Sequence, residues 1–161
     1  MEQREFTRAI DVALAGIEEA RHLRHVEAEL VYLDQLGMAY ANTRREAEAL
    51  RTYRRQTTLA REQHKVYLIS FGMWNQTRLL ARLRRPEQAA VAMAFAKRYW
   101  ELHYSPVRAE DERHIRRVCG LVAAQSGEAA CQAHWERGLT MPLAEGLALG
   151  CHGDPHGAVA A

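Results

Sequence analysis

Metal-ligand side chains gather near the C-terminal end, where Cys151, His152, Asp154 and His156 fall within six residues. Thiolate, imidazole and carboxylate groups of this kind can bind transition-metal ions. Their spacing lacks the paired CxxC or HxxxH geometry of established metal sites, and glycines flank them. The sequence therefore predicts neither a bound metal nor a cofactor, and we expect residues 151–161 to form a flexible tail.

Residues that could act as nucleophiles occur in no catalytic pattern. Ser70, Ser105 and Ser126 lie outside any strand–turn–helix elbow, and no glycine-rich phosphate loop is present. Cys119 lies among apolar neighbours on a predicted helix, where burial raises the thiol pKa and makes the group inert. We therefore expect that this chain is not an enzyme.

Arginines recur at helical spacing in two stretches, and they define an alternative site. The basic residues of this stripe are Arg44, Arg51, Arg55, Arg78 and Arg85. Such residues can bind phosphate groups or acidic ligands, which makes a nucleic-acid or acidic-ligand binder the alternative function. Interleaved glutamates favour an ordinary solvated helix face. A net charge of +2 and the lack of a recognition-helix motif do not predict nucleic acid as the partner.

Composition predicts one helical domain over residues 1–150. The 161 residues include only four prolines, and the longest apolar run, residues 89–96, is far shorter than the ~20 residues of a membrane span. Three cysteines, an odd number at wide spacing, favour a reducing compartment. The N-terminus is charged and has no apolar signal segment, so we expect a cytoplasmic protein without membrane partners.

Apolar residues follow the 3.6-residue helical period through nearly the whole chain. This pattern predicts an all-α fold of about seven or eight helices. The predicted helices are 6–25, 27–41, 43–63, 66–84, 86–103, 105–126, 128–139 and 142–149. Thr43 with Glu46 predicts a capping box, Ser105 an N-cap, and Pro86 a first helical position. Gly150 is expected to end the last helix.

The helix pair of residues 31–59 carries a recognisable spacing of large and small residues. Its members are Leu33, Leu36, Gly37, Tyr40, Ala49 and Tyr53. This pattern resembles the tetratricopeptide (TPR) repeat, in which small residues lie where helices cross closely and large ones fill the space between them. The resemblance implies a TPR-like solenoid of antiparallel helix pairs.

A second, looser copy of the pattern follows. Its members are Trp74, Ala81, Ala90 and Ala94, with Thr77 and Arg78 in place of the family's Leu and Gly. The two copies are spaced more widely than the usual ~34 residues, which implies long helices. Ala9 and Ala13 resemble the second helix of an earlier repeat.

Further residues resemble the C-terminal helical arrays of large bacterial signal-transduction ATPases and kinases. They are Trp74–Asn75, Arg85–Pro86–Glu87 and the closing runs 133–138 and 143–149. Because no nucleotide-binding motif is present, this resemblance implies the sensor or scaffold part alone.

The TPR resemblance also implies a function, a non-catalytic protein–protein interaction module that binds a peptide or protein in a concave groove. The groove residues that it implies are Asp34, Met38, Asn42, Asn75, Leu79 and Arg82. Ile10, Leu14 and Ile17 would lie at the open end of such an array without a partner helix. We therefore expect the chain to self-associate as a homo-oligomer.

Overall fold

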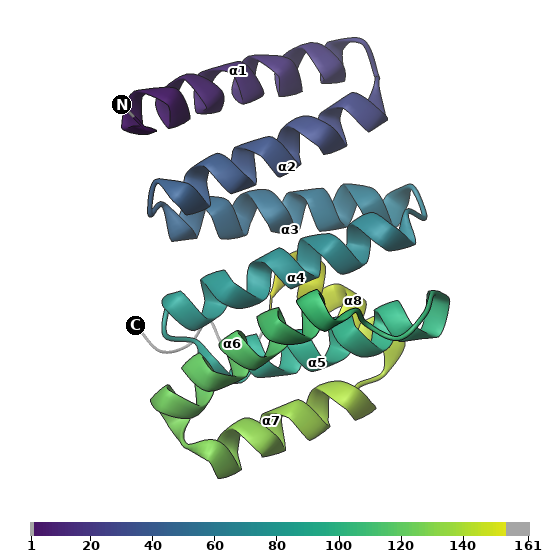
Figure 1. The fold of residues 1–161 in the computed structure, drawn as a ribbon. Coiled ribbons are helices and arrows are strands. Elements are labelled where there is room, and N and C mark those ends of the chain that lie inside the picture. Colours follow the sequence, from purple (N-terminus) through teal and green to yellow (C-terminus); the bar gives the residue numbers. More distant parts are fainter. Residues whose placement is uncertain (1, 154–161) are drawn as a thin grey trace.

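The computed structural model describes residues 2–153, with side chains described from Glu5 onward. Every regular element in this part of the chain is an α-helix, and consecutive helices pack against each other (Figure 1). The elements are α1 (Glu2–His22), α2 (Val26–Asn42), α3 (Glu46–Glu62), α4 (Val66–Arg82), α5 (Pro86–His103), α6 (Ala109–Ser126), α7 (Glu128–Thr140) and α8 (Leu143–His152). The all-α class predicted from the sequence is confirmed.

The first four turns share one backbone design. Helices α2 to α5 begin at residues 26, 46, 66 and 86, so the chain advances by one helix every 20 residues. Each turn holds one non-glycine residue at positive φ: Arg24 (52°), Arg44 (61°), His64 (54°) and Arg84 (56°). The amide that follows each of them bonds to a carbonyl five residues earlier, as His25 does to Ala20 at 2.7 Å. This left-handed closure satisfies the helix C-terminus and reverses the chain in three residues.

Two predicted caps are wrong. The Thr43 hydroxyl does not begin α3; it donates back to the Ala39 and Tyr40 carbonyls at the end of α2, at 2.9 and 3.1 Å. The next helix after α5 begins at Ala109 rather than Ser105, and Asp111 caps it by accepting the Arg108 amide at 3.4 Å. The Thr43 error arises because a hydroxyl can bond to backbone groups on either side of a turn.

Small residues let the helices of each pair approach closely. A Cβ atom added at Gly37 of α2 would lie 2.7 Å from the ring of Tyr53 on α3. Gly16 of α1 lies in the same way against the Tyr32 ring of α2. The eight-residue run from Ala89 to Ala96 in α5 is fully buried because α4, α6, α7 and α8 all contact that helix.

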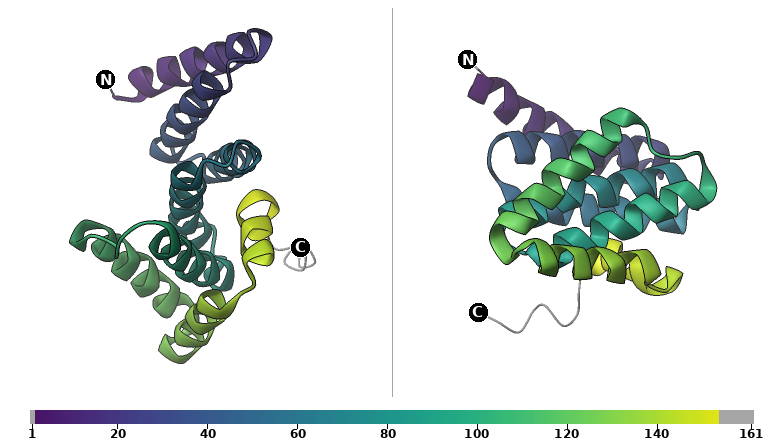
Figure 2. Two further views of the ribbon diagram at one scale, coloured as in Figure 1. Left: turned by 90° about the vertical axis from the view of Figure 1, so that its right-hand side faces the viewer. Right: turned by 60° about the horizontal axis from the view of Figure 1, so that its bottom comes forward.

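The C-terminal helices close the core instead of continuing the regular array. Helix α7 packs on α5, and α8 returns to contact α3, α4 and α5 on the side opposite α6 (Figure 2, left). Gly146 of α8 lies against the Phe95 ring, and Gly150 against Met73. The buried Gln76 side chain of α4 donates to the Gly150 carbonyl at 2.9 Å. The predicted end at Gly150 is wrong, since α8 runs to His152 and Gly153 caps it.

At the N-terminal end, α1 packs against α2 and buries most of its apolar side. Ile10 and Ile17 lie in the core, whereas Leu14 is exposed. Two of the three residues expected to lack a partner therefore have one. Within the described residues, no helix combines the length and apolar character that a membrane crossing requires.

Candidate binding face

Helices α2 and α4 turn equivalent sides to solvent. Positions that lie 40 residues apart have similar exposure, because the helices begin 20 residues apart and every second helix faces the same way. The four pairs are Val31/Phe71, Asp34/Trp74, Met38/Arg78 and Asn42/Arg82. We call the surface formed by these eight residues the α2–α4 face.

Helices α2 and α4 both pack on α3, which contributes Tyr53 to the region between them. Burial raises the pKa of Tyr53; the nearby Asp34 carboxylate adds to this rise and Arg78 opposes it. One charge from each helix therefore lies close to the same hydroxyl. Burial also raises the pKa of Asp34, although Gln56 donates to its Oδ1 at 3.4 Å and opposes the rise. The floor of the face is thus partly buried and polar.

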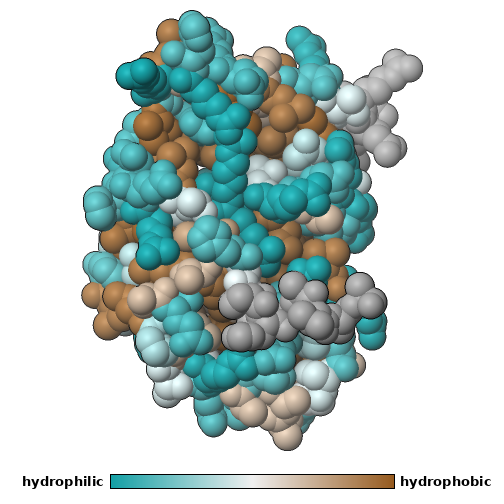
Figure 3. Space-filling view, turned by 180° about the vertical axis from the view of Figure 1, so that it is seen from behind, coloured by the Kyte–Doolittle hydropathy of each residue, from teal (hydrophilic) through white to brown (hydrophobic). Residues whose placement is uncertain are grey.

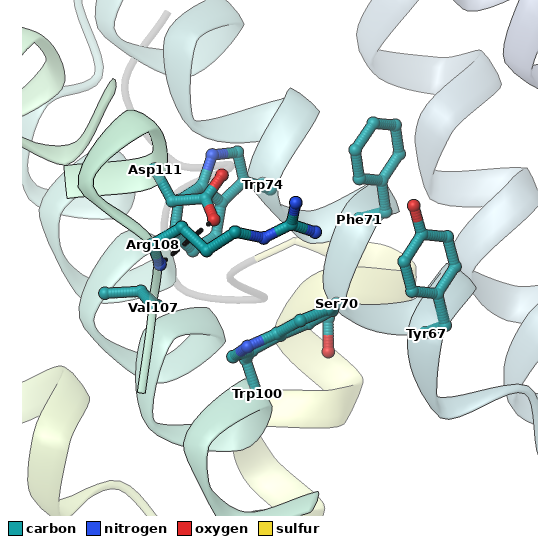
Figure 4. A pocket seen from close by; sticks show the side chains of 8 residues that line it. All are labelled: Tyr67, Ser70, Phe71, Trp74, Trp100, Val107, Arg108 and Asp111. Atoms are coloured by element: carbon teal, nitrogen blue, oxygen red, sulfur yellow. Dashed lines mark hydrogen bonds between the residues drawn. The ribbon is translucent and has the colours of Figure 1, made fainter. Parts of the chain in front are cut away.

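Two cavities border this face, one at each end. The first, about 430 Å³, lies between α1 and α2 and includes Phe6, Val12, Met38 and Asn42 in its lining. The second, about 70 Å³, lies where α4 meets the end of α5 and the start of α6, and we call it the aromatic pocket. Its eight lining residues are Tyr67, Ser70, Phe71, Trp74, Trp100, Val107, Arg108 and Asp111 (Figure 4).

The rings of the aromatic pocket are held by contacts with one another. The Tyr67 and Phe71 rings stack with centroids 5.8 Å apart, and Trp100 meets Tyr67 edge-on at 5.8 Å. Trp74 stacks on His114 of α6 at 5.6 Å, which joins α4 to α6. Such offset and edge-on pairs are the favoured arrangements of aromatic rings, so the walls of the pocket are preformed.

A basic cluster lies near the C-terminal end of α4. The pKa of Arg82 is lowered by burial and, to a smaller extent, by the positive charges of Arg78 and Arg44. Glu46 is the counter-charge, but its carboxylate is 4.0 Å from the Arg82 guanidinium. Arginines from the α2–α3 turn and from α4 therefore gather with incomplete neutralisation.

The arginine stripe expected from the sequence is divided by the fold. Arg44 and Arg78 lie in the basic cluster, whereas Arg55 binds Glu29 of α2 at 2.6 Å. Arg85 precedes α5 and lies close enough to Arg54 to lower its pKa, after the larger effect of burial. Arg51 is exposed on α3. The structure thus brings together only part of the predicted stripe.

The predicted groove residues do not all lie at the surface. Asp34, Met38, Asn42 and Arg82 lie on the α2–α4 face, and Asn75 is half-buried beside it. Leu79 is only 1% exposed and belongs to the core, so it is not open to a partner. The sequence pattern pairs Met38 with Leu79, whereas the structural period pairs Met38 with Arg78. The predicted second copy is therefore shifted by one residue at this position.

The sequence interpretation did not identify the residues of the aromatic pocket. Tyr67, Phe71 and Trp74 lie at i, i+4 and i+7 on the solvent side of α4, a spacing that would have revealed an exposed aromatic stripe. Trp100 and Arg108 come from the end of one helix and the start of another. Only the turn between them, which has no regular sequence pattern, determines that they meet α4.

Side chains considered for metal or thiol chemistry are scattered. No group of three or more potential metal ligands occurs among the residues that the structure describes. Cys151 is a buried free thiol on α8, and Asp154 and His156 lie outside the described part. Burial, with a smaller effect of neighbouring Cys131, raises the pKa of Cys119 to about 11, so this thiol is protonated at neutral pH.

Seen from behind (Figure 3), hydrophobic areas of the surface are interrupted by hydrophilic side chains. On the exposed side of α4, aromatic residues (Tyr67, Phe71, Trp74) are followed by arginines (Arg78, Arg82).

Comparison with known proteins gives no match: neither a family model, nor a curated protein, nor a solved structure corresponds to this chain.

Proposed function

We propose that this chain is a TPR-like, non-catalytic interaction module that binds a peptide or protein segment along the α2–α4 face. The 40-residue repeat of helix pairs and the contact of Gly37 with Tyr53 support the TPR-like part of the proposal. A scaffold or sensor role in bacterial signal transduction, in the cytoplasm, follows from the resemblance of the sequence and belongs to the same proposal.

One observation carries this function: large apolar side chains are exposed along α2 and α4. Val31, Met38, Tyr67 and Phe71 are each between 41% and 54% exposed. They share α2 and α4 with the partly buried Asp34 and with the arginines of α4, so the surface combines exposed apolar side chains with charged ones. This combination is typical of protein interaction sites.

A selection from a random dodecapeptide library on the purified chain tests the proposal. Substitutions Met38→Asp and Phe71→Asp change one exposed side chain on each helix of the face. We expect each to weaken selected peptides by about 30-fold, the loss that corresponds to a hot-spot residue of ~2 kcal/mol. Leu143→Asp, an equally exposed apolar position at the start of α8, is the matched control.

The result that would reject the proposal is binding that all three variants retain, or a selection that enriches no peptide. Circular dichroism of each variant shows whether the fold is intact. Because both face residues are already exposed, their replacement removes little buried surface, and the variants should fold.

The basic cluster supports a second candidate, an acidic-ligand binder. Arg44, Arg78 and Arg82 lie near one another with Glu46 as the partial counter-charge. Arg78→Glu would then abolish binding of an acidic peptide, whereas Arg51→Glu, an exposed arginine outside the cluster, would leave it unchanged. A steep fall of affinity with salt would accompany this second function.

A further inference from the structure

The aromatic pocket contains a buried polar atom that the fold leaves without a partner. Ser70 is 2% exposed, lines the pocket, and its Oγ makes no hydrogen bond. Hydroxyls elsewhere in these helices are satisfied: those of Thr52 and Thr57 donate to the carbonyl one turn earlier, both at 2.8 Å. A buried unsatisfied hydroxyl is costly, and a ligand atom that bonds to it would remove that cost.

Arg108 supplies a second unused group. Its side chain extends from the start of α6 toward Phe71 and Tyr67 (Figure 4), and its guanidinium forms no ion pair within the described part of the chain. Asp111, which also lines the pocket, accepts a hydrogen bond from the Arg108 backbone amide. A planar guanidinium without a carboxylate partner can stack on the face of an aromatic ring.

The lining favours a neutral ligand. It carries one charge of each sign, Arg108 and Asp111, so it has no net charge that would select an ion of either sign. A purely aliphatic group would leave the Ser70 hydroxyl unsatisfied. A neutral aromatic ring with a polar atom on its edge matches all of these features.

We propose that the aromatic pocket binds a tyrosine or tryptophan side chain, whose polar edge bonds to Ser70 while its face lies against Arg108. This inference rests on the proposed function, because the side chain would be the anchor of the bound peptide. A cavity of about 70 Å³ is smaller than the ~150 Å³ cavity that encloses benzene, so the ring enters edge-first and Arg108 covers its exposed part.

Amino-acid amides test the pocket separately from the peptide face. The probes are the N-acetyl amides of tyrosine, phenylalanine, tryptophan, leucine and arginine, titrated into the 161-residue chain and followed by NMR. We expect the tyrosine and tryptophan amides to bind most tightly. Phenylalanine amide, which lacks the polar edge, should bind about 2- to 12-fold more weakly than tyrosine amide, the equivalent of one hydrogen bond.

Two variants assign the contacts. Ser70→Ala should abolish the preference for tyrosine over phenylalanine and leave phenylalanine binding unchanged, which a merely structural role would not do. Arg108→Gln should weaken both amides by the same factor, and Arg113→Gln on the same helix is its control. Equal or tighter binding of the leucine or arginine amide, or a tyrosine preference that survives Ser70→Ala, would overturn the inference.

The two proposals fail in different ways. Selected peptides that lose binding in Met38→Asp but contain no preferred tyrosine or tryptophan would leave the binding face in place and reject the aromatic anchor. Amides that bind as expected, with no peptide selected, would keep the pocket as a site for small aromatic compounds and reject the peptide function.

Discussion

The helices from α2 to α5 follow one repeating design, whereas those from α6 to α8 do not. In the first region each helix has 17 or 18 residues, and neighbours are joined by a three-residue turn with one left-handed residue. In the second region helix length falls from 18 to 10 residues, and the turns have no common geometry. Regular turns therefore extend the array, whereas irregular ones fold it back and close its core.

The aromatic pocket lies at the boundary between these regions. Its α4 residues belong to the repeating part, and Val107 and Arg108 belong to the first irregular connection. Repetition alone would place another identical turn after α5. The departure from that design brings α6 onto α4 and creates a cavity that the repeating helices do not form by themselves.

The largest expected effect concerns the closing region. Phe95 is fully buried in α5 and contacts α8, so Phe95→Ala should lower the free energy of unfolding by ~3–5 kcal/mol. Urea denaturation measures this value, and Leu102→Ala, at a 64% exposed position on the same helix, is the control, with an expected change within ~0.5 kcal/mol. Equal effects of the two substitutions would show that α8 does not complete the core.

Two glycines of the closing region have opposite surroundings. A Cβ at Gly146 would collide with the Phe95 ring, so Gly146→Ala should destabilise the protein by ~1–3 kcal/mol through overpacking. Gly120 on α6 has no atom within 4 Å of such a Cβ. Gly120→Ala should therefore stabilise by ~0.5–1 kcal/mol, as alanine does in an open helix position. Thermal unfolding of both variants checks the opposite signs.

The repeating turns predict a gain in stability. His64 has a φ of 54°, a left-handed conformation that costs a non-glycine residue ~1–2 kcal/mol. His64→Gly should recover up to ~1 kcal/mol, because glycine also loses more freedom on folding. Gln63→Gly, one residue earlier at φ −92°, should instead destabilise. A loss of stability in both variants would contradict the strain assigned to these turns.

The smallest expected effect is a pH dependence where α4 meets α6. Burial and, to a smaller extent, the positive charge of Arg78 lower the pKa of His114 below its usual 6.5. A hydrogen bond with the Trp74 backbone and the negative charge of Asp111 partly oppose this decrease. Below pH 6.5 the unfolded chain binds more protons than the folded one, so stability should fall as the pH drops from 6.5. His114→Asn should flatten this part of the profile, measured by urea unfolding between pH 5.5 and 7.5. The same change in exposed His152→Asn would contradict the assignment.

Sequence patterns predicted the repeating region well, because its helices obey one period. The predicted and observed ends of α4 and α5 agree within two residues. The copies were nevertheless misaligned by one residue, since Trp74 resembles a packing position. In the structure its neighbour Met73 is the buried equivalent of Leu33, and Thr77 fills the place of Gly37.

The closing region was less predictable for a physical reason. Glycines such as Gly146 and Gly150 are typical of a helix end in sequence. In the structure, their lack of a side chain leaves room for Phe95 and Met73. Such contacts join residues far apart in the sequence and leave no local period. The Ser70 hydroxyl was likewise indistinguishable from an ordinary helical serine until its missing partner could be seen.

The return of α8 has a consequence for how the molecule opens. Gln76 and Gly150, 74 positions apart, share a hydrogen bond, so α3 to α5 cannot separate from one another without also releasing α8. In the part of the chain that the structure describes, no such hydrogen bond joins α1 or α2 to α8, and α1 packs chiefly on α2. Partial unfolding should therefore begin at the first helix pair, whose amides should exchange with deuterium sooner than those of α3 to α5. The half of the binding face that α2 contributes would then be its adaptable half, and the half on α4 its rigid one.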